Sequence, residues 1–150
     1  MICYLQFVES KFRIEDVLIR QASEFLKNYI TMKKTLIIGA SSNPERYSYL
    51  AAERLLAHGH DIEMIGKRPD VIFNKTINTQ KKPFNDIDTV TLYLSYDFQT
   101  EYYDYILSLN PNRVIFNPGT ENPELEILLN NNNIQTEEAC TLVLLRSGQY

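Results

Sequence analysis

The segment from Gly39 to Arg46 has the composition of a phosphate-binding loop. It follows a short apolar run that ends in glycine, and it precedes a stretch with helical spacing. Glycine lets the backbone turn tightly, while the first turn of a helix offers free N–H groups and the positive end of its dipole to an anion. We expect a phosphate or diphosphate to be held by Gly39, Ala40, Ser41, Ser42 and, through charge-assisted hydrogen bonds, Arg46. Because only the first glycine of G-x-G-x-x-G is present, a plain strand-to-helix connection is the alternative.

A basic turn, Gly66-Lys67-Arg68, follows the second predicted strand. Dinucleotide sites for NAD place an acidic residue near this position, where it bonds the ribose 2′-hydroxyl. Basic residues instead favour a ligand with an extra ribose phosphate, such as the 3′-phosphate of coenzyme A or the 2′-phosphate of NADP. We therefore predict that Gly66, Lys67 and Arg68 lie at the cofactor. An exposed basic turn without a ligand is the alternative.

A third glycine-containing loop, 116–122, again lies between a predicted strand and a predicted helix. Its Asn117, Pro118 and Gly119 would let the backbone approach a ligand closely, although a Pro-Gly turn capped by asparagine also forms without one. Cys140 follows the last predicted strand and so falls on the same side as these loops. A lone cysteine is more often a small core residue than a nucleophile.

Few residues suit catalysis. His58 and His60 flank Gly59 in a turn on the side opposite the predicted ligand loops, where we expect both to be surface residues. Neither H-E-x-x-H nor a paired C-x-x-C occurs, so a metal site is not expected. Because no acid–base constellation and no activating base for Cys140 can be identified, the pattern favours binding over catalysis.

Alternating strand and helix patterns position these loops. Apolar and β-branched runs predict strands at 35–38, 61–65, 88–94, 113–116 and 134–138, with a further short strand near 71–77. Helical spacing predicts helices at 49–56, 99–109 and 122–130, while residues 141–145 fit either strand or helix. This alternation predicts an α/β fold with a doubly wound, mostly parallel sheet and helices on both faces, hence three layers. In such folds ligands bind at the carboxyl ends of the strands.

The first 31 residues have a different pattern. Apolar residues recur at helical spacing and predict one amphipathic helix: Ile14, Val17, Leu18, Ala22, Phe25, Leu26 and Tyr29. Four basic and four acidic residues leave this segment neutral. Because Met32 immediately precedes the first predicted strand, we interpret 1–31 as a helical extension, an appendage or a start-site artefact, and 32–150 as the ligand-binding domain.

Composition narrows the classes of function. A chain of 150 residues with 44% hydrophobic and 23% charged residues is typical of one globular domain. Its net charge of −4 and the lack of a Lys/Arg run argue against nucleic acid or an anionic membrane as partner. No apolar stretch of 18 residues and no signal peptide occur, and the only cysteines are Cys3 and Cys140, so we expect a cytoplasmic protein with reduced thiols. Homo-oligomerisation is left open.

Several of these segments together resemble the CoA-binding-domain family, which includes the nucleotide-binding domain of the succinyl-CoA synthetase α subunit. The resemblance covers about residues 34–150 in order. It rests on the run 36–44, the turn 65–67, the strand 88–93, the block 115–122 and the late Cys140.

The resemblance implies a Rossmann-like sheet whose first loop, Gly39 to Ser42, holds the diphosphate of coenzyme A, with the Gly66-Lys67 turn near the adenosine. It also implies that the 117–119 loop and Cys140 line the rest of the groove, and that Cys140 starts a last helix. It does not extend to the synthetase domain that carries the phosphorylated histidine, so ligase activity is not implied. We therefore expect a stand-alone module that binds coenzyme A or an acyl-CoA. The alternatives are a small NADP-dependent oxidoreductase and an interaction protein with an empty pocket.

Overall fold

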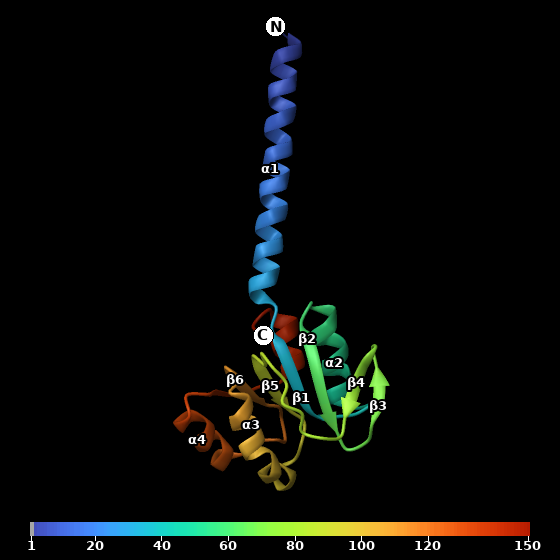
Figure 1. Cartoon of the computed structure of the whole chain (residues 1–150), viewed down its shortest axis with the longest axis vertical. Coiled ribbons are helices and arrows are strands. Elements are labelled where there is room, and N and C mark those ends of the chain that lie inside the picture. The colour runs from blue at the N-terminus through green and yellow to red at the C-terminus, as the bar shows by residue number, and fades with distance from the viewer. Residues whose placement is uncertain (1) are drawn as a thin grey trace. The chain divides into compact units, whose positions relative to one another are not determined.

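The computed structural model describes the backbone of residues 2–150 and the side chains of residues 13–27 and 32–150. The chain divides into two compact units, of which the first ends at Met32 and the second spans Lys33–Tyr150. The first unit holds a single helix, α1 (Ile2–Thr31), as its helical spacing predicts (Figure 1). Among its described side chains the large apolar ones are exposed: Ile14, Val17, Leu18, Ile19, Phe25, Leu26 and Met32.

The second unit is built on a seven-stranded sheet in the order β3-β4-β2-β1-β5-β6-β7. All neighbouring strands are parallel except β3 and β4, which form an antiparallel hairpin at one edge. The strands are β1 (Lys34–Ala40), β2 (Asp61–Gly66), β3 (Asp70–Ile72), β4 (Lys75–Asn78), β5 (Thr89–Leu92), β6 (Arg113–Phe116) and β7 (Gln135–Glu138). The central strand β1 is almost wholly buried, as its continuous apolar run predicts.

Helices cover both faces of the sheet, because side chains alternate along β1 and supply two cores. Leu36 and Ile38 pack with residues of α3 (Tyr103–Leu109) and α4 (Pro123–Asn131). Ile37 packs on the other face with residues of α2 (Tyr47–Ala57) and α5 (Thr141–Ser147). The predicted three-layer, doubly wound α/β fold is confirmed (Figure 1).

The predicted local elements form, with differences in detail. The short strand predicted near 71–77 is a hairpin, whose turn residues Phe73 and Asn74 have positive φ. The helix predicted at 99–109 begins with a 3-10 turn, Thr100–Tyr102, which follows another at Tyr96–Phe98. The ambiguous segment 141–145 is helical and begins after Cys140, as the family resemblance implies.

His60 differs from its prediction as a surface residue. It is buried, its Nδ1 accepts a hydrogen bond from the Lys33 N–H at 3.1 Å, and its ring lies 4.8 Å from that of Tyr150. The C-terminal segment after α5 folds back over the amino ends of the strands and covers this histidine. His58, its neighbour in the turn, is exposed as predicted.

Candidate functional site

A cleft of about 660 Å³ opens at the carboxyl ends of β1 and β5. These two strands are neighbours at the point where the chain reverses its direction of travel across the sheet. From β1 the chain crosses through α2 to β2 on one side, whereas β5 continues to β6 and β7 on the other. Loops diverge at such a switch point and leave a crevice between them, which is where doubly wound folds bind ligands.

Two glycines let the strand ends approach closely enough to form the cleft floor. Gly39 has φ +92°, and a Cβ at this position would lie 2.7 Å from the carbonyl carbon and oxygen of Tyr93 at the end of β5. A Cβ on Gly66 would collide with the carbonyl oxygen of Ala40, beside the irregularity in β1 between Ile38 and Ala40. Both positions therefore exclude any side chain, for steric reasons that require no ligand.

The loop between β1 and α2 holds its own shape. The Ser41 hydroxyl oxygen accepts a hydrogen bond from the Asn43 N–H at 3.1 Å, and the side-chain oxygen of Asn43 accepts one from the Glu45 N–H at 3.0 Å. Helix α2 then begins after Arg46, whose side chain provides no cap, and its first turn contains no acidic residue. Its N-terminus therefore keeps its positive partial charge beside the cleft.

Basic side chains line the cleft. Arg46, Lys67 and Arg68 belong to its lining, and no carboxylate within the described residues does. An acidic residue lies just outside, where Asp70 accepts a hydrogen bond from the Ser42 hydroxyl that lowers the pKa of the Asp70 carboxyl. The cleft thus combines a helix N-terminus with three cationic side chains, an arrangement that favours an anionic, multiply phosphorylated ligand.

The opposite wall is formed by the loops after β5 and β6. The Gln99 side-chain amide donates to the carbonyl oxygens of Leu94 at 2.9 Å and Thr120 at 2.7 Å, and so ties the two loops together. The Asn122 amide donates to the Gln99 side-chain oxygen at 2.9 Å, while the Asn122 oxygen caps α4. The loop at 118–120 is therefore fixed in place by buried side chains that do not line the cleft.

The structure brings nine of the twelve predicted cofactor-binding residues into the cleft lining. These are Gly39, Ala40, Ser41, Ser42, Arg46, Lys67, Arg68, Pro118 and Gly119. Gly66 lies behind the lining, where it packs against the Ala40 carbonyl. Asn117 and Cys140 are also outside it.

Asn117 is buried, and its side chain is engaged within the protein. Its amide nitrogen donates to the Thr91 hydroxyl at 2.7 Å and the Leu92 carbonyl at 2.9 Å, and its oxygen accepts from the Thr141 N–H at 2.9 Å. It thereby joins β5, the loop after β6 and the first residue of α5. Cys140 is half-buried, carries a free thiol and precedes that same helix.

Sequence reasoning missed six residues of the lining: Asn43, Tyr47, Ser48, Tyr93, Ser95 and Thr120. Ser48 and Tyr47 follow the predicted loop directly, so a search extended by one helical turn would have included them. Tyr93 carried no such signal, because an aromatic residue at the end of an apolar strand is typical of a core position. Burial raises the pKa of the Tyr93 phenol, which keeps it protonated at the cleft floor.

The second unit of the chain matches a known family of proteins. The family model described as "CoA binding domain" matches residues 33–146. Comparison with curated proteins found no match. None of the helices in the described part of the chain has the length and apolar character of a membrane span.

Solved structures share the fold. The crystal structure of an uncharacterized protein is 50% identical over 80% of this chain and 99% of its own, with a TM-score of 0.79. A Thermus thermophilus protein is 18% identical over 85% of this chain and 98% of its own, with a TM-score of 0.69. A hypothetical protein from Pyrococcus horikoshii is 20% identical over 83% and 89%, with a TM-score of 0.70. At these lower identities the likeness concerns the fold.

Proposed function

This chain belongs to the CoA binding domain family, and we propose on that basis that it binds coenzyme A or an acyl-CoA in the cleft at the carboxyl ends of β1 and β5. One observation carries the proposal beyond the family match. Three basic side chains and the uncapped N-terminus of α2 converge on a cleft that holds no described carboxylate. Coenzyme A carries a diphosphate and a ribose 3′-phosphate, which need such a concentration of positive charge.

The parts of the cleft suggest an orientation for the ligand. The diphosphate would lie against the Gly39–Ser42 loop and the N-terminus of α2, where Arg46 is within the lining. The 3′-phosphate would lie at Lys67 and Arg68. The remaining wall, with Tyr93 and the 118–120 loop, would hold the less charged pantetheine portion.

The same residues support a binding module in preference to an acid–base catalyst. Neither histidine lines the cleft, and its Tyr93 phenol has a raised pKa, so that it is a poor base at neutral pH. Asn117 would position the loop and α5, since its amide is already fully engaged. The free thiol of Cys140 is consistent with the proposed cytoplasmic location.

A ligand panel tests the proposal. Titration calorimetry and thermal shift on the full chain would compare coenzyme A, dephospho-CoA, NADP and NAD, because a ligand that binds only the folded state raises the melting temperature. We expect coenzyme A to bind most tightly, followed by dephospho-CoA. Equal or tighter binding of NADP would favour the oxidoreductase alternative and overturn the proposal.

A further inference from the structure

A second cavity of about 550 Å³ lies between α2 and α5, on one face of the sheet. Its floor is apolar and includes Leu50, Leu142 and Leu145, while Arg54, His58 and Arg146 stand at its rim. No part of the proposed coenzyme A site uses these residues. The volume is within the range of small-molecule sites in proteins.

The groove lies on the face of α2 that also carries one residue of the cleft lining. Tyr47 belongs to the cleft lining, and Leu50, Arg54 and His58 follow it at spacings of three, four and four residues, which keeps all four on the same side of a helix. This ridge extends for about 16 Å along the helix axis. On the other side of the groove α5 starts directly after Cys140, at the carboxyl edge of the sheet.

The rim of the groove is positively charged although the chain as a whole is acidic. Arg54 has only a long contact of 4.0 Å with Glu53, and no described carboxylate lies within ion-pair distance of Arg146. The His58 Nδ1 lies 2.8 Å from the Arg54 carbonyl oxygen, which places the ring beside this helical turn. Guanidinium groups in this position match the fork geometry of a carboxylate.

We propose that the groove between α2 and α5 receives the acyl group of an acyl-CoA bound in the cleft, and that the preferred acyl group ends in a carboxylate. This inference rests on the proposed binding of coenzyme A. The apolar floor would contact the methylene chain, and Arg54 and Arg146 would pair with the terminal carboxylate. Leu50 and Arg54 are separated by about 6 Å along the axis of α2. An acyl chain of medium length would span this distance between the floor and the rim.

Three ligands test the inference by calorimetry on the full chain: coenzyme A, hexanoyl-CoA and adipoyl-CoA. The last two have acyl chains of six carbons and differ in the terminal carboxylate. We expect hexanoyl-CoA to bind about threefold or more tighter than coenzyme A, because part of the chain leaves water, and adipoyl-CoA to bind about threefold or more tighter again. Equal affinity for all three ligands, or equal affinity for the two acyl-CoAs, would overturn the inference.

Two charge reversals test whether the preference for a terminal carboxylate depends on the groove. Arg146→Glu should abolish the advantage of adipoyl-CoA and leave the affinity for coenzyme A within about twofold, since Arg146 lies outside the cleft lining. Lys82→Glu changes the net charge equally at an exposed site outside both cavities, and should alter none of the affinities. An equal loss for all ligands in Arg146→Glu would contradict the inference. If coenzyme A itself fails to bind the unmodified chain, the proposed function is refuted as well, so the two failures are distinguishable.

Discussion

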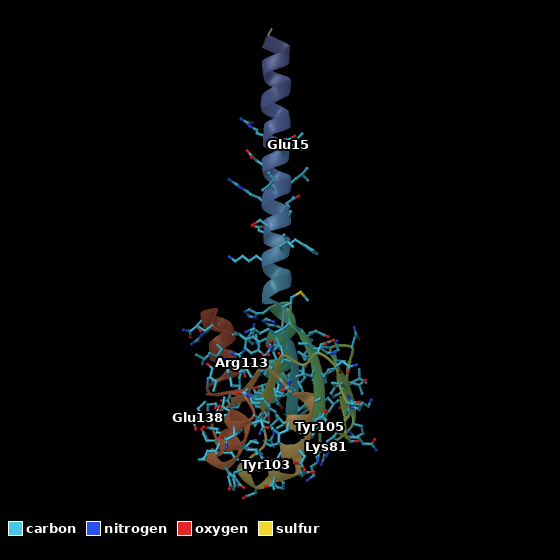
Figure 2. The ribbon with its side chains drawn as sticks, turned by 60° about the vertical axis from the view of Figure 1, so that its left-hand side comes forward. Glu15, Lys81, Tyr103, Tyr105, Arg113 and Glu138 are labelled. Atoms are coloured by element: carbon cyan, nitrogen blue, oxygen red, sulfur yellow. The ribbon has the colours of Figure 1, made fainter. Side chains whose placement is uncertain are left out.

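Charged side chains are paired differently at the two ends of the sheet. At the amino ends of the strands, polar and charged side chains pair with one another, although the Nη2 of Arg113 is buried without a hydrogen-bond partner. Arg113, labelled in Figure 2, donates to Glu137 at 3.1 Å and to the Thr89 hydroxyl at 3.4 Å, and its guanidinium lies 4.8 Å from the Tyr150 ring centre. The Tyr150 hydroxyl in turn lies 2.5 Å from that of Thr35.

At the carboxyl ends, cationic side chains project into the cleft without such partners. Arg46, Lys67 and Arg68 are exposed, and no ion pair within the described residues involves them. A buried polar group that is unpaired costs stability, so the pairing within this cluster is explained by folding alone. Converging charge that the fold does not neutralise supports the proposed anionic ligand. We therefore propose that the charged side chains at the amino ends contribute to stability and that those at the carboxyl ends contribute to binding, and the following changes test both ends of the sheet.

The largest effect is expected from Gly39→Ala at the carboxyl end. The new Cβ would collide with the Tyr93 backbone, and φ +92° is unfavourable for alanine, so we expect a loss of more than about 3 kcal/mol in the free energy of unfolding. Gly59→Ala is the matched control at the amino end, with φ +82° and no atom within 4 Å of the Cβ. The free energy of unfolding of Gly59→Ala should fall by only about 1–2 kcal/mol. Urea denaturation measures both, and equal losses would show that the close approach at Gly39 is unimportant.

The second largest effect is expected from Arg113→Met, which should lower the free energy of unfolding by about 2–4 kcal/mol. The side chain of Arg113 is only 13% exposed, and its removal leaves the Glu137 carboxylate without its ion-pair partner, whereas the Thr89 hydroxyl keeps its hydrogen bond to Asp88. The affinity for coenzyme A should stay unchanged, because Arg113 lies at the other end of the sheet. Unchanged stability of Arg113→Met, or a weakened affinity of this variant for coenzyme A, would contradict the proposed difference between the two ends of the sheet.

Lys67→Glu should have the opposite effect to Arg113→Met, because it should weaken binding and leave stability unchanged. We expect unchanged stability and a loss of about 1–3 kcal/mol in the binding free energy of coenzyme A, with a smaller loss for dephospho-CoA, which lacks the 3′-phosphate. Lys82→Glu is the matched control for net charge. Equal losses for both ligands would show that Lys67 does not contact that phosphate.

A smaller effect concerns pH at the amino end. Burial, together with the positive charges of Lys33, His58 and Arg113, lowers the pKa of His60, while Asp88 acts against this. Below about pH 6.5 the unfolded chain binds a proton that the folded protein does not, so the free energy of unfolding should fall as the pH is lowered through this window. His60→Asn, which keeps an acceptor for the Lys33 N–H, should flatten this dependence, and His58→Asn should leave it in place. An unaltered pH profile for His60→Asn would contradict the assignment.

The smallest effect is expected from removal of the first unit. We propose that a chain beginning at Met32 keeps the melting temperature, solution size and affinity for coenzyme A of the full chain, because the family match starts at residue 33. Thermal unfolding, light scattering and calorimetry would compare the two chains. A large fall in melting temperature or a change in oligomeric state would show that the exposed apolar side chains of α1 are covered by a partner surface.

The sequence by itself determined the strand-loop-helix units and the end of the sheet at which the ligand loops meet. The apolar run before Gly39, the basic turn at Lys67 and the Asn122-Pro123 helix start are local patterns, and local patterns reflect backbone preference and burial directly. Nine predicted residues consequently lie together in the cleft lining. The family resemblance added the helix after Cys140, which periodicity left undecided.

Only the tertiary structure decided which of these polar residues face the cleft and which are enclosed. Asn117 is turned inward by Thr91 and Thr141, and His60 is covered by Tyr150; their partners lie 24 residues or more away along the chain. Tyr93 lines the cleft because Gly39 passes beside its backbone. Such contacts depend on how distant strands and helices pack. The residues next to each position in the sequence do not determine that packing.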